Sequence, residues 1–389
     1  MSLPDHLIAL RDEALQTSCE SWAIRSRWKL APGLDRSGPC PTCGGNDRFS
    51  IHTKKNTFNC RRCGIAGEGV IKLVMEVQGV DFTTACEIIT GRKADAPIDP
   101  VRAARIAEEN AAVEEKRAIE AERYREQARK DGYGIWRSCA PREQRQDLLA
   151  YLQVRGLVTS DLIAVFDQVQ LRQHRLPFMV QLASKRWQEI HNGLVMVAAV
   201  QLADGRFGAV HQTWLDLDQP KGKVELVHPE TGEAVPAKKV RGSKKGGAIR
   251  LFTPAEATRI VMGEGIETTG TALAHNFEPA TAYWAGVDLG NMAGKARRDA
   301  AGKQQHDLPD LDDLECFLPP DWCTELVYLA ETDTPEHHTT EKIIRGLLRA
   351  QTLRRRAQHT NPALPDLVTA FVEPPETGGD LNDLVRVNF

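Results

Sequence analysis

The chain has 389 residues, of which 41% are hydrophobic and 26% are charged, and its formal net charge is −3. This length allows two or three domains, each with its own core. The slight negative charge excludes a uniformly basic nucleic-acid-binding protein, so any basic surface must be local. No run approaches the length of a membrane span and the first residues lack a signal peptide, so we expect a cytoplasmic protein without a membrane partner.

Four of the nine cysteines form two Cys-x-x-Cys pairs separated by sixteen residues, namely Cys40, Cys43, Cys60 and Cys63. This spacing is typical of a zinc ribbon, in which four thiolates surround one structural Zn²⁺. The alternative is a set of four buried free cysteines. Between the pairs, residues 48–52 and 57–60 alternate between apolar and polar side chains, which predicts a hairpin.

Basic and aromatic residues surround these cysteines. Arg48, Arg61 and Arg62 could contact phosphates, whereas Phe49 and Phe58 are better interpreted as the small core of the ribbon than as stacking surfaces. From about residue 39 to 91 the sequence resembles the zinc-binding domain of primases. The resemblance implies a DNA-binding domain, to which we assign residues 1–95.

A long helix is predicted next. Asp99 can cap it, Pro100 suits its first turn, and a run rich in Ala, Glu and Arg continues to Asp131 and Gly132. Such a helix would extend about 45 Å. It lacks a regular apolar heptad, so residues 96–132 are interpreted as a spacer rather than a coiled-coil dimer, holding the zinc domain away from a catalytic body.

Residues 133–255 are predicted to form a helical and mixed subdomain. Residues 195–200 and 205–215 alternate like a half-buried antiparallel hairpin. Six cations follow within thirteen residues, together with three glycines and no acid, which predicts a flexible basic loop for phosphate contacts. The alternative is a merely solvated charged loop. The six cations are Lys238, Lys239, Arg241, Lys244, Lys245 and Arg250.

Three apolar runs in the last part of the chain each lead into acidic residues. Residues 260–262 precede Glu264, residues 325–330 precede Glu331 and Asp333, and residues 367–372 precede Asp380. If the runs are strands of one sheet, their ends supply oxygen ligands suited to Mg²⁺ or Mn²⁺. Glu267, one helical turn after Glu264, could assist this site or only orient it.

This order of motifs resembles the Toprim domain of DnaG-type primases and of the primases of phages and mobile elements. The resemblance covers roughly residues 260–385, within a predicted α/β domain at 256–389. It implies that Glu264, Glu331 and Asp333 are catalytic and hold Mg²⁺ together with Asp380. The chain departs from the pattern because its acid pair begins with Glu331 rather than an Asp, which predicts a retained but altered site that works better with Mn²⁺.

The expected fold is therefore α/β and α+β in several domains, from a zinc ribbon through a helical spacer and a basic subdomain to Toprim. The resemblance implies a DNA primase, a nucleotidyltransferase that makes short RNA primers on single-stranded DNA from ribonucleoside triphosphates for a phage, plasmid or mobile element. No Gly-x-x-x-x-Gly-Lys-Ser/Thr loop occurs, so the helicase partner is expected to be a separate protein. The alternatives are a non-catalytic zinc-dependent DNA-binding replication factor and a Toprim nuclease.

Overall fold

The computed structural model describes residues 4–96, 100–141, 144–158, 170–299, 304–331, 338–373 and 381–382. It divides into two compact units, Met1–Arg123 and Tyr124–Phe389. Each unit has its own hydrophobic core.

The first unit contains the cysteine pairs. Its elements in chain order are α1 (Asp5–Leu15), α2 (Cys19–Arg25), β1 (Asp35–Cys40), β2 (Gly44–His52), β3 (Thr57–Cys60), β4 (Ala66–Glu68), α3 (Val70–Gln78) and α4 (Phe82–Thr90). The four strands pair antiparallel in the order of the sequence. The predicted hairpin is confirmed as β2 and β3, in which Phe49 lies opposite Cys60 and Ile51 opposite Phe58. Phe49 and Phe58 are buried, which confirms their role as core residues.

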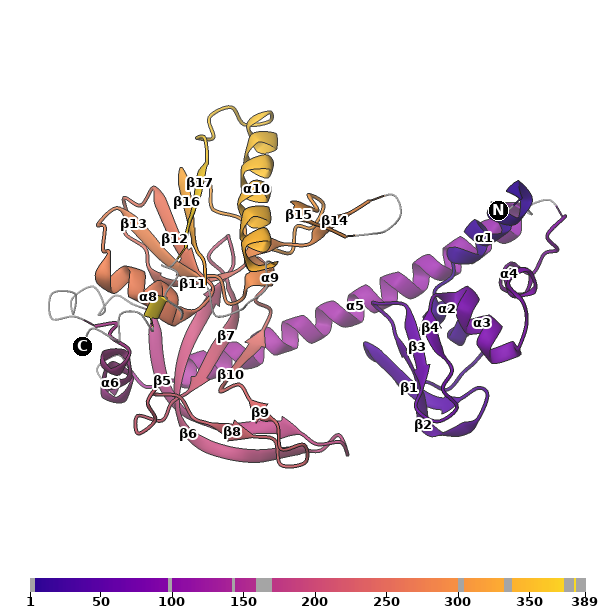
Figure 1. The fold of residues 1–389 in the computed structure, drawn as a ribbon, viewed down its shortest axis with the longest axis horizontal. Helices are drawn as coiled ribbons and strands as arrows, with labels where there is room; N and C mark the ends of the chain where they lie inside the picture. Colours follow the sequence, from indigo (N-terminus) through magenta and orange to yellow (C-terminus); the bar gives the residue numbers. More distant parts are fainter. Residues whose placement is uncertain are drawn as a thin grey trace. The chain divides into compact units, whose positions relative to one another are not determined.

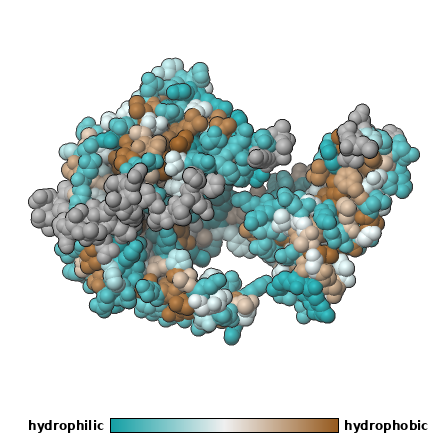
Figure 2. All heavy atoms as spheres, viewed as in Figure 1, coloured by the Kyte–Doolittle hydropathy of each residue, from teal (hydrophilic) through white to brown (hydrophobic). Residues whose placement is uncertain are grey.

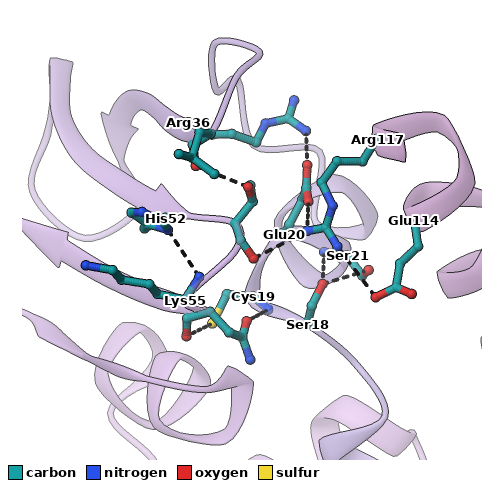
Figure 3. A network of polar contacts seen from close by, with 12 residues as sticks. Ser18, Cys19, Glu20, Ser21, Arg36, His52, Lys55, Glu114 and Arg117 are labelled. Carbon is teal, nitrogen blue, oxygen red and sulfur yellow. Dashed lines mark hydrogen bonds and ion pairs between the residues drawn. The ribbon is translucent and has the colours of Figure 1, made fainter. Parts of the chain in front are cut away.

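Helix α5 (Pro100–Ser138) contributes to both units. Its first half packs on the zinc ribbon through a buried carboxylate, as Figure 3 shows. Glu20 Oε1 accepts a 2.6 Å hydrogen bond from Arg36, and Glu20 Oε2 accepts a 3.1 Å bond from Arg117 of α5. Arg117 also donates to the carbonyl of Thr53 on the ribbon. The first half of the helix is thus part of the zinc unit as well as a connector.

The predicted end of this helix at Asp131 and Gly132 is wrong, because the helix continues to Ser138. A glycine within a helix costs only about 1 kcal/mol relative to alanine. Here Gly132 permits a close approach, since a Cβ atom at this position would lie 2.5 Å from the carbonyl oxygen of Arg241. Tyr133 then packs on Phe207, with ring centroids 5.3 Å apart. Packing in the second unit therefore extends the helix beyond its local stop signal.

The second unit is built on a mixed sheet (Figure 1). Within the described residues, the sheet has nine strands. Eight of them follow the order β10-β7-β6-β11-β13-β12-β16-β17, and the ninth, β5, pairs with β6. The strands on its antiparallel side are β5 (Leu171–Gln181), β6 (Trp187–Gln201), β7 (Phe207–Trp214), β10 (Lys238–Gly242) and β11 (Ala248–Phe252). The parallel strands are β12 (Arg259–Gly263), β13 (Thr281–Ala285), β16 (Glu325–Leu329) and β17 (Val368–Val372). The predicted strands near 260, 325 and 367 are thereby confirmed.

Helices and short hairpins complete the second unit. These elements are α6 (Gln146–Val154), β8 (Leu226–Val227), β9 (Ala234–Val235), α8 (Ile266–His275), α9 (Leu289–Ala293), β14 (Ala296–Arg298), β15 (Gln304–Pro309) and α10 (His338–Gln358). Alternate residues of the parallel strands enter two different cores. Val261 and Val327 share a core with α8, whereas Met262 and Tyr328 share another with α10. Burial on both faces is typical of parallel α/β sheets and confirms the predicted α/β class.

Arginines of α10 hold the segment between β15 and β16 in place by hydrogen bonds to its backbone carbonyls. Arg349 is fully buried and donates to the backbone carbonyls of Phe317 and Asp313. Arg354 donates to four further carbonyls, including those of Pro320 and Cys323. This segment is therefore fixed against the domain.

The surface gives no sign of a membrane span. In the part of the chain that the structure describes, no helix combines the length and the apolar character needed to cross a bilayer. Hydrophilic residues cover much of the face drawn in Figure 2, and hydrophobic residues form separate patches on it.

Candidate functional site: four thiols and a paired-carboxylate cavity

The four predicted zinc ligands converge at one end of the ribbon sheet. The Sγ atoms of Cys40, Cys43, Cys60 and Cys63 all lie within 4.8 Å of one another. Cys40 is 3.7 Å from Cys63 and Cys43 is 3.6 Å from Cys60, sulfur to sulfur. Tetrahedral zinc with bonds near 2.3 Å needs sulfurs about 3.8 Å apart. The cluster therefore fits one structural Zn²⁺.

The backbone around the cysteines also suits a metal site. Gly44 and Gly64 each follow the second cysteine of a pair and have φ values of +67° and +77°, which glycine adopts without strain. A backbone hydrogen bond from Cys63 lowers the pKa of Cys60 to about 6. The thiolate form that binds zinc is thus favoured at this position.

The basic residues of the ribbon differ in their surroundings. Arg61 pairs with Asp47 at 3.0 Å and also donates to the carbonyl of that residue. Arg62 is exposed beside the metal cluster, and Arg48 is half-buried against Gly45. Arg62 is therefore the arginine of this group best placed for an added phosphate contact.

Two of the predicted catalytic acids meet at one edge of the parallel sheet. Glu264 directly follows β12, and Glu331 lies two residues beyond the end of β16. These strands are parallel neighbours, with Met262 opposite Tyr328, so their carboxyl ends coincide. Asp333 and Asp380, the other two acids assigned to this site, lie outside the described residues.

Glu264 and Glu331 line two adjoining cavities. The first has a volume of about 210 Å³ and is bordered by Arg155, His211, Thr213, Lys223, Lys238, Ile249, Glu264, Gly265, Ile266, Glu267, Thr268, Val287 and Glu331. The second, of about 230 Å³, is bordered by Lys238, Glu264, Leu289, Met292, Leu329, Glu331, Thr339 and Ile343. The two carboxylates and Lys238 are thus accessible from two sides and place opposite charges around the same space.

The donor set around Glu331 is made of oxygen atoms. The buried hydroxyl of Thr268 donates a 2.5 Å hydrogen bond to Glu331 Oε1. Carboxylate oxygens supplied by Glu264 and Glu331 suit a hard divalent cation such as Mg²⁺ or Mn²⁺. The described part of the site therefore fits the ion that the sequence predicts. It contains two of the four proposed ligands, Glu264 and Glu331.

The predicted flexible basic loop is wrong, because Lys238, Lys239 and Arg241 belong to strand β10. Successive side chains of a strand point to opposite faces, and these three cations are divided accordingly. Lys238 lines both cavities. Lys239 donates to the carbonyl of Met179 and lies 4.1 Å from the ring centroid of Phe178. Arg241 forms an ion pair with an aspartate of α5.

The remaining cations of this stretch are also engaged elsewhere. Lys244 pairs with Asp288, and Lys245 pairs with Glu315. Arg250 lies on β11, where its guanidinium is 4.5 Å from the ring centroid of Trp284. Of the six cations, Lys238 alone borders the two acid cavities. Contact of the others with nucleic acid stays a prediction.

Sequence reasoning missed several residues of the first cavity. His211 and Thr213 lie two residues apart on β7, and Thr213 is opposite Lys238 in the strand register. Their spacing of two residues on a predicted strand, which places both side chains on one face, was the available signal. Arg155 directly follows α6 and Lys223 follows a turn, and no periodic pattern marks either position. Arg155 is 2% exposed, and its Nε and Nη1 atoms are buried without a hydrogen-bond partner among the residues that the structure describes.

Comparisons with known proteins agree with the N-terminal assignment. Residues 35–70 match a family described as the zinc-binding domain of primase-helicase. Residues 125–251 match a family described as a domain of unknown function, DUF7146. The resemblance of the N-terminal module to primase zinc ribbons is thereby confirmed.

Two solved structures are similar to this chain at low levels. One is a DNA primase domain from Pseudomonas aeruginosa, with 13% identity and a TM-score of 0.33 over 63% of this chain and 68% of that chain. The other is the primase fragment of the bacteriophage T7 primase-helicase protein, with 10% identity and a TM-score of 0.27 over 90% of this chain and 94% of that chain.

Proposed function

We propose that this protein is a DNA primase, which synthesises short RNA primers on single-stranded DNA from ribonucleoside triphosphates. The observation that carries the proposal is the meeting of Glu264 and Glu331 at the carboxyl ends of β12 and β16, where both line cavities shared with Lys238. A primase-type zinc ribbon on the same chain supports it further. The primers would serve replication of a phage, plasmid or mobile element, together with a separate replicative helicase.

The roles of the residues follow from their charge. Glu264 and Glu331, together with Asp333 and Asp380 as predicted from the sequence, would hold Mg²⁺ or Mn²⁺. The bound ion would neutralise negative charge on the triphosphate and would lower the pKa of the attacking 3′ hydroxyl. Lys238, which borders the same cavities, would contact phosphate oxygens as a point charge. The zinc ribbon would contact the template strand.

The test is primer synthesis on a mixture of single-stranded templates with labelled ribonucleotides in Mg²⁺ or Mn²⁺. We expect short, alkali-sensitive products from the parent and none from Glu264→Gln. The matched control is Glu278→Gln, because Glu278 pairs with Arg259 at the opposite end of β12 and borders neither cavity. Products from Glu264→Gln at the parent rate would show that the acid site is elsewhere.

The same assay separates the two alternatives. Metal-dependent cleavage of the template without primer synthesis would indicate a nuclease on a Toprim-like site. Template binding with neither synthesis nor cleavage would indicate a non-catalytic zinc-dependent replication factor. Neither outcome is compatible with the primase proposal.

A further inference from the structure

Glu267 is a third carboxylate beside the proposed metal site, yet its surroundings differ from those of Glu264 and Glu331. Its Oε1 atom accepts a 2.6 Å hydrogen bond from the hydroxyl of Tyr151 and lies 2.6 Å from the Lys223 ammonium. Its side chain is 14% exposed. One oxygen of the carboxylate therefore already has two strong donors.

Three separate segments meet at this carboxylate. Tyr151 belongs to α6, Glu267 to α8, and Lys223 follows the turn that leaves β7. Gly222 has a φ of +67°, and a Cβ atom there would lie 2.8 Å from the Tyr151 ring. The turn backbone thus packs directly on the ring whose hydroxyl binds Glu267. Lys223 is fixed at its backbone by this packing and at its ammonium by the carboxylate.

The charge of Glu267 matches this contact. Burial acts to raise the pKa of Glu267, but the charge of Lys223, its hydrogen bond and the hydrogen bonds from Tyr151 and the backbone together outweigh burial and lower that pKa to about 2. Among the described residues, the zinc cysteines are the one group of three or more Cys, His, Asp or Glu with ligand atoms within 4.8 Å of one another. Glu264, Glu267 and Glu331 therefore do not form a compact three-carboxylate cluster.

We propose that Glu267 is a positioning residue that acts through Lys223 and does not ligate the divalent metal. Lys223 borders the 210 Å³ cavity together with Glu264 and Glu331, and the proposed function assigns this cavity to the nucleotide phosphates. A free lysine side chain samples many rotamers. A buried acceptor that binds the ammonium restricts these rotamers before the reaction, so less side-chain entropy is lost when the lysine meets its substrate. This inference rests on the proposed primase function, which gives the cavity its substrate.

The first test uses Glu267→Gln, Lys223→Met, the double variant and Glu264→Gln. Mn²⁺ affinity is measured by electron paramagnetic resonance, and kcat and KM are measured in primer synthesis. We expect Glu264→Gln to weaken Mn²⁺ binding, whereas Glu267→Gln keeps it within about twofold and lowers kcat about tenfold, as expected for loss of a charged hydrogen bond. KM for the ribonucleotide should not rise, because the substitution removes a negative charge near an anionic substrate.

Coupling between the two residues is the second readout. If Glu267 acts through Lys223, Glu267→Gln should have no further effect on kcat once Lys223 is Met. Tyr151→Phe, which keeps the ring against Gly222 and removes only the hydroxyl, should lower kcat less than Glu267→Gln. A loss of Mn²⁺ affinity equal to that of Glu264→Gln would make Glu267 a metal ligand and overturn the inference. So would an equal effect of Glu267→Gln with and without Lys223.

A readout without catalysis separates this inference from the proposed function. Acetic anhydride labelling followed by mass spectrometry measures how readily the Lys223 amine reacts in the intact protein. We expect faster labelling of Lys223 in Glu267→Gln, with Lys245, paired with Glu315, as the internal reference. If the parent makes no primers, the primase proposal fails, and unchanged Lys223 labelling then overturns the positioning role as well.

Discussion

The hydroxyl of Thr268 donates to Glu331 Oε1 over 2.5 Å, which links the first turn of α8 to the end of β16. Thr268 is buried, lies four residues after Glu264 and borders the same cavity as Glu264 and Glu331. A glutamate has one more rotatable bond than an aspartate, and this hydrogen bond restricts the added freedom.

Replacing Thr268 should therefore weaken the metal site without altering its charge. Thr268→Val keeps the shape of the side chain and removes the donor, and a hydrogen bond to a charged group contributes about 1.5–3 kcal/mol. We expect a higher Mn²⁺ requirement for primer synthesis, measured by metal titration. Thr268→Ser, which retains the hydroxyl, is the control, and equal titration curves for both variants would contradict the role of the hydroxyl.

The glutamate at position 331 should also determine which metal works best. Mg²⁺ requires near-octahedral geometry at roughly 2.0–2.1 Å, whereas Mn²⁺ accepts the same ligands. We expect the parent to prefer Mn²⁺ and Glu331→Asp to shift the ratio of rates toward Mg²⁺. The measurement is primer synthesis with each ion at saturation. An unchanged ratio would show that the side-chain length at this position does not set the preference.

Loss of one thiol should release zinc from the ribbon. Cys60→Ser leaves three thiols at a site whose sulfurs lie 3.6–3.7 Å apart in pairs. We expect zinc below one ion per chain by elemental analysis and weaker template binding. Cys316→Ser is the control, because Cys316 lies in the second unit and donates to Asp313 through a group that serine replaces. A full zinc content in Cys60→Ser would remove that residue from the ligand set.

Arg62 should contribute a phosphate contact to template binding. It is exposed next to the zinc cluster, whereas Arg61 is paired with Asp47. Arg62→Ala should weaken binding to single-stranded DNA and reduce the slope of log affinity against log salt by about 0.7. Arg105→Ala, on an exposed part of α5, should leave that slope unchanged. Equal slopes for parent and Arg62→Ala would show that Arg62 makes no phosphate contact and is only a solvated surface residue.

His211 should make the second unit less stable at low pH. Burial lowers the pKa of His211 from 6.5 to about 4, so the unfolded chain binds a proton that the folded chain does not bind between these values. The contribution of neutral His211 to the free energy of unfolding is fully present above pH 6.5 and is lost as pH falls toward 4. The loss amounts to about 3 kcal/mol. Urea unfolding at pH 7 and pH 4.5 should show a smaller difference for His211→Asn than for the parent. His359→Asn, at an exposed position, should retain the parent difference.

The sequence predicted the parts of the molecule that depend on local pattern. Two cysteine pairs indicated the zinc cluster, and apolar runs ending in acids placed Glu264 and Glu331 at strand ends, because parallel strands share an edge. The basic stretch was interpreted incorrectly, since three glycines suggested flexibility. Pairing with β7 places Lys238 and Lys239 in a strand. Successive side chains of a strand point to opposite faces of the sheet, so these two lysines are separated. Lys223 reaches the cavity from a turn whose position depends on packing against Tyr151, which no local pattern encodes.

Helix α5 also determines how the zinc-binding unit could be separated from the rest of the protein. A truncation at residue 95 would remove Arg117 and leave the largely buried Glu20 with Arg36 as its remaining ionic partner. Glu20 would lose one of the two cations that compensate its burial, which should destabilise the fragment. A stable fragment should therefore extend to residue 123, where the first compact unit ends. Such a fragment would carry its own helical stalk, and the end of that stalk would be a suitable point for fusion to another catalytic domain.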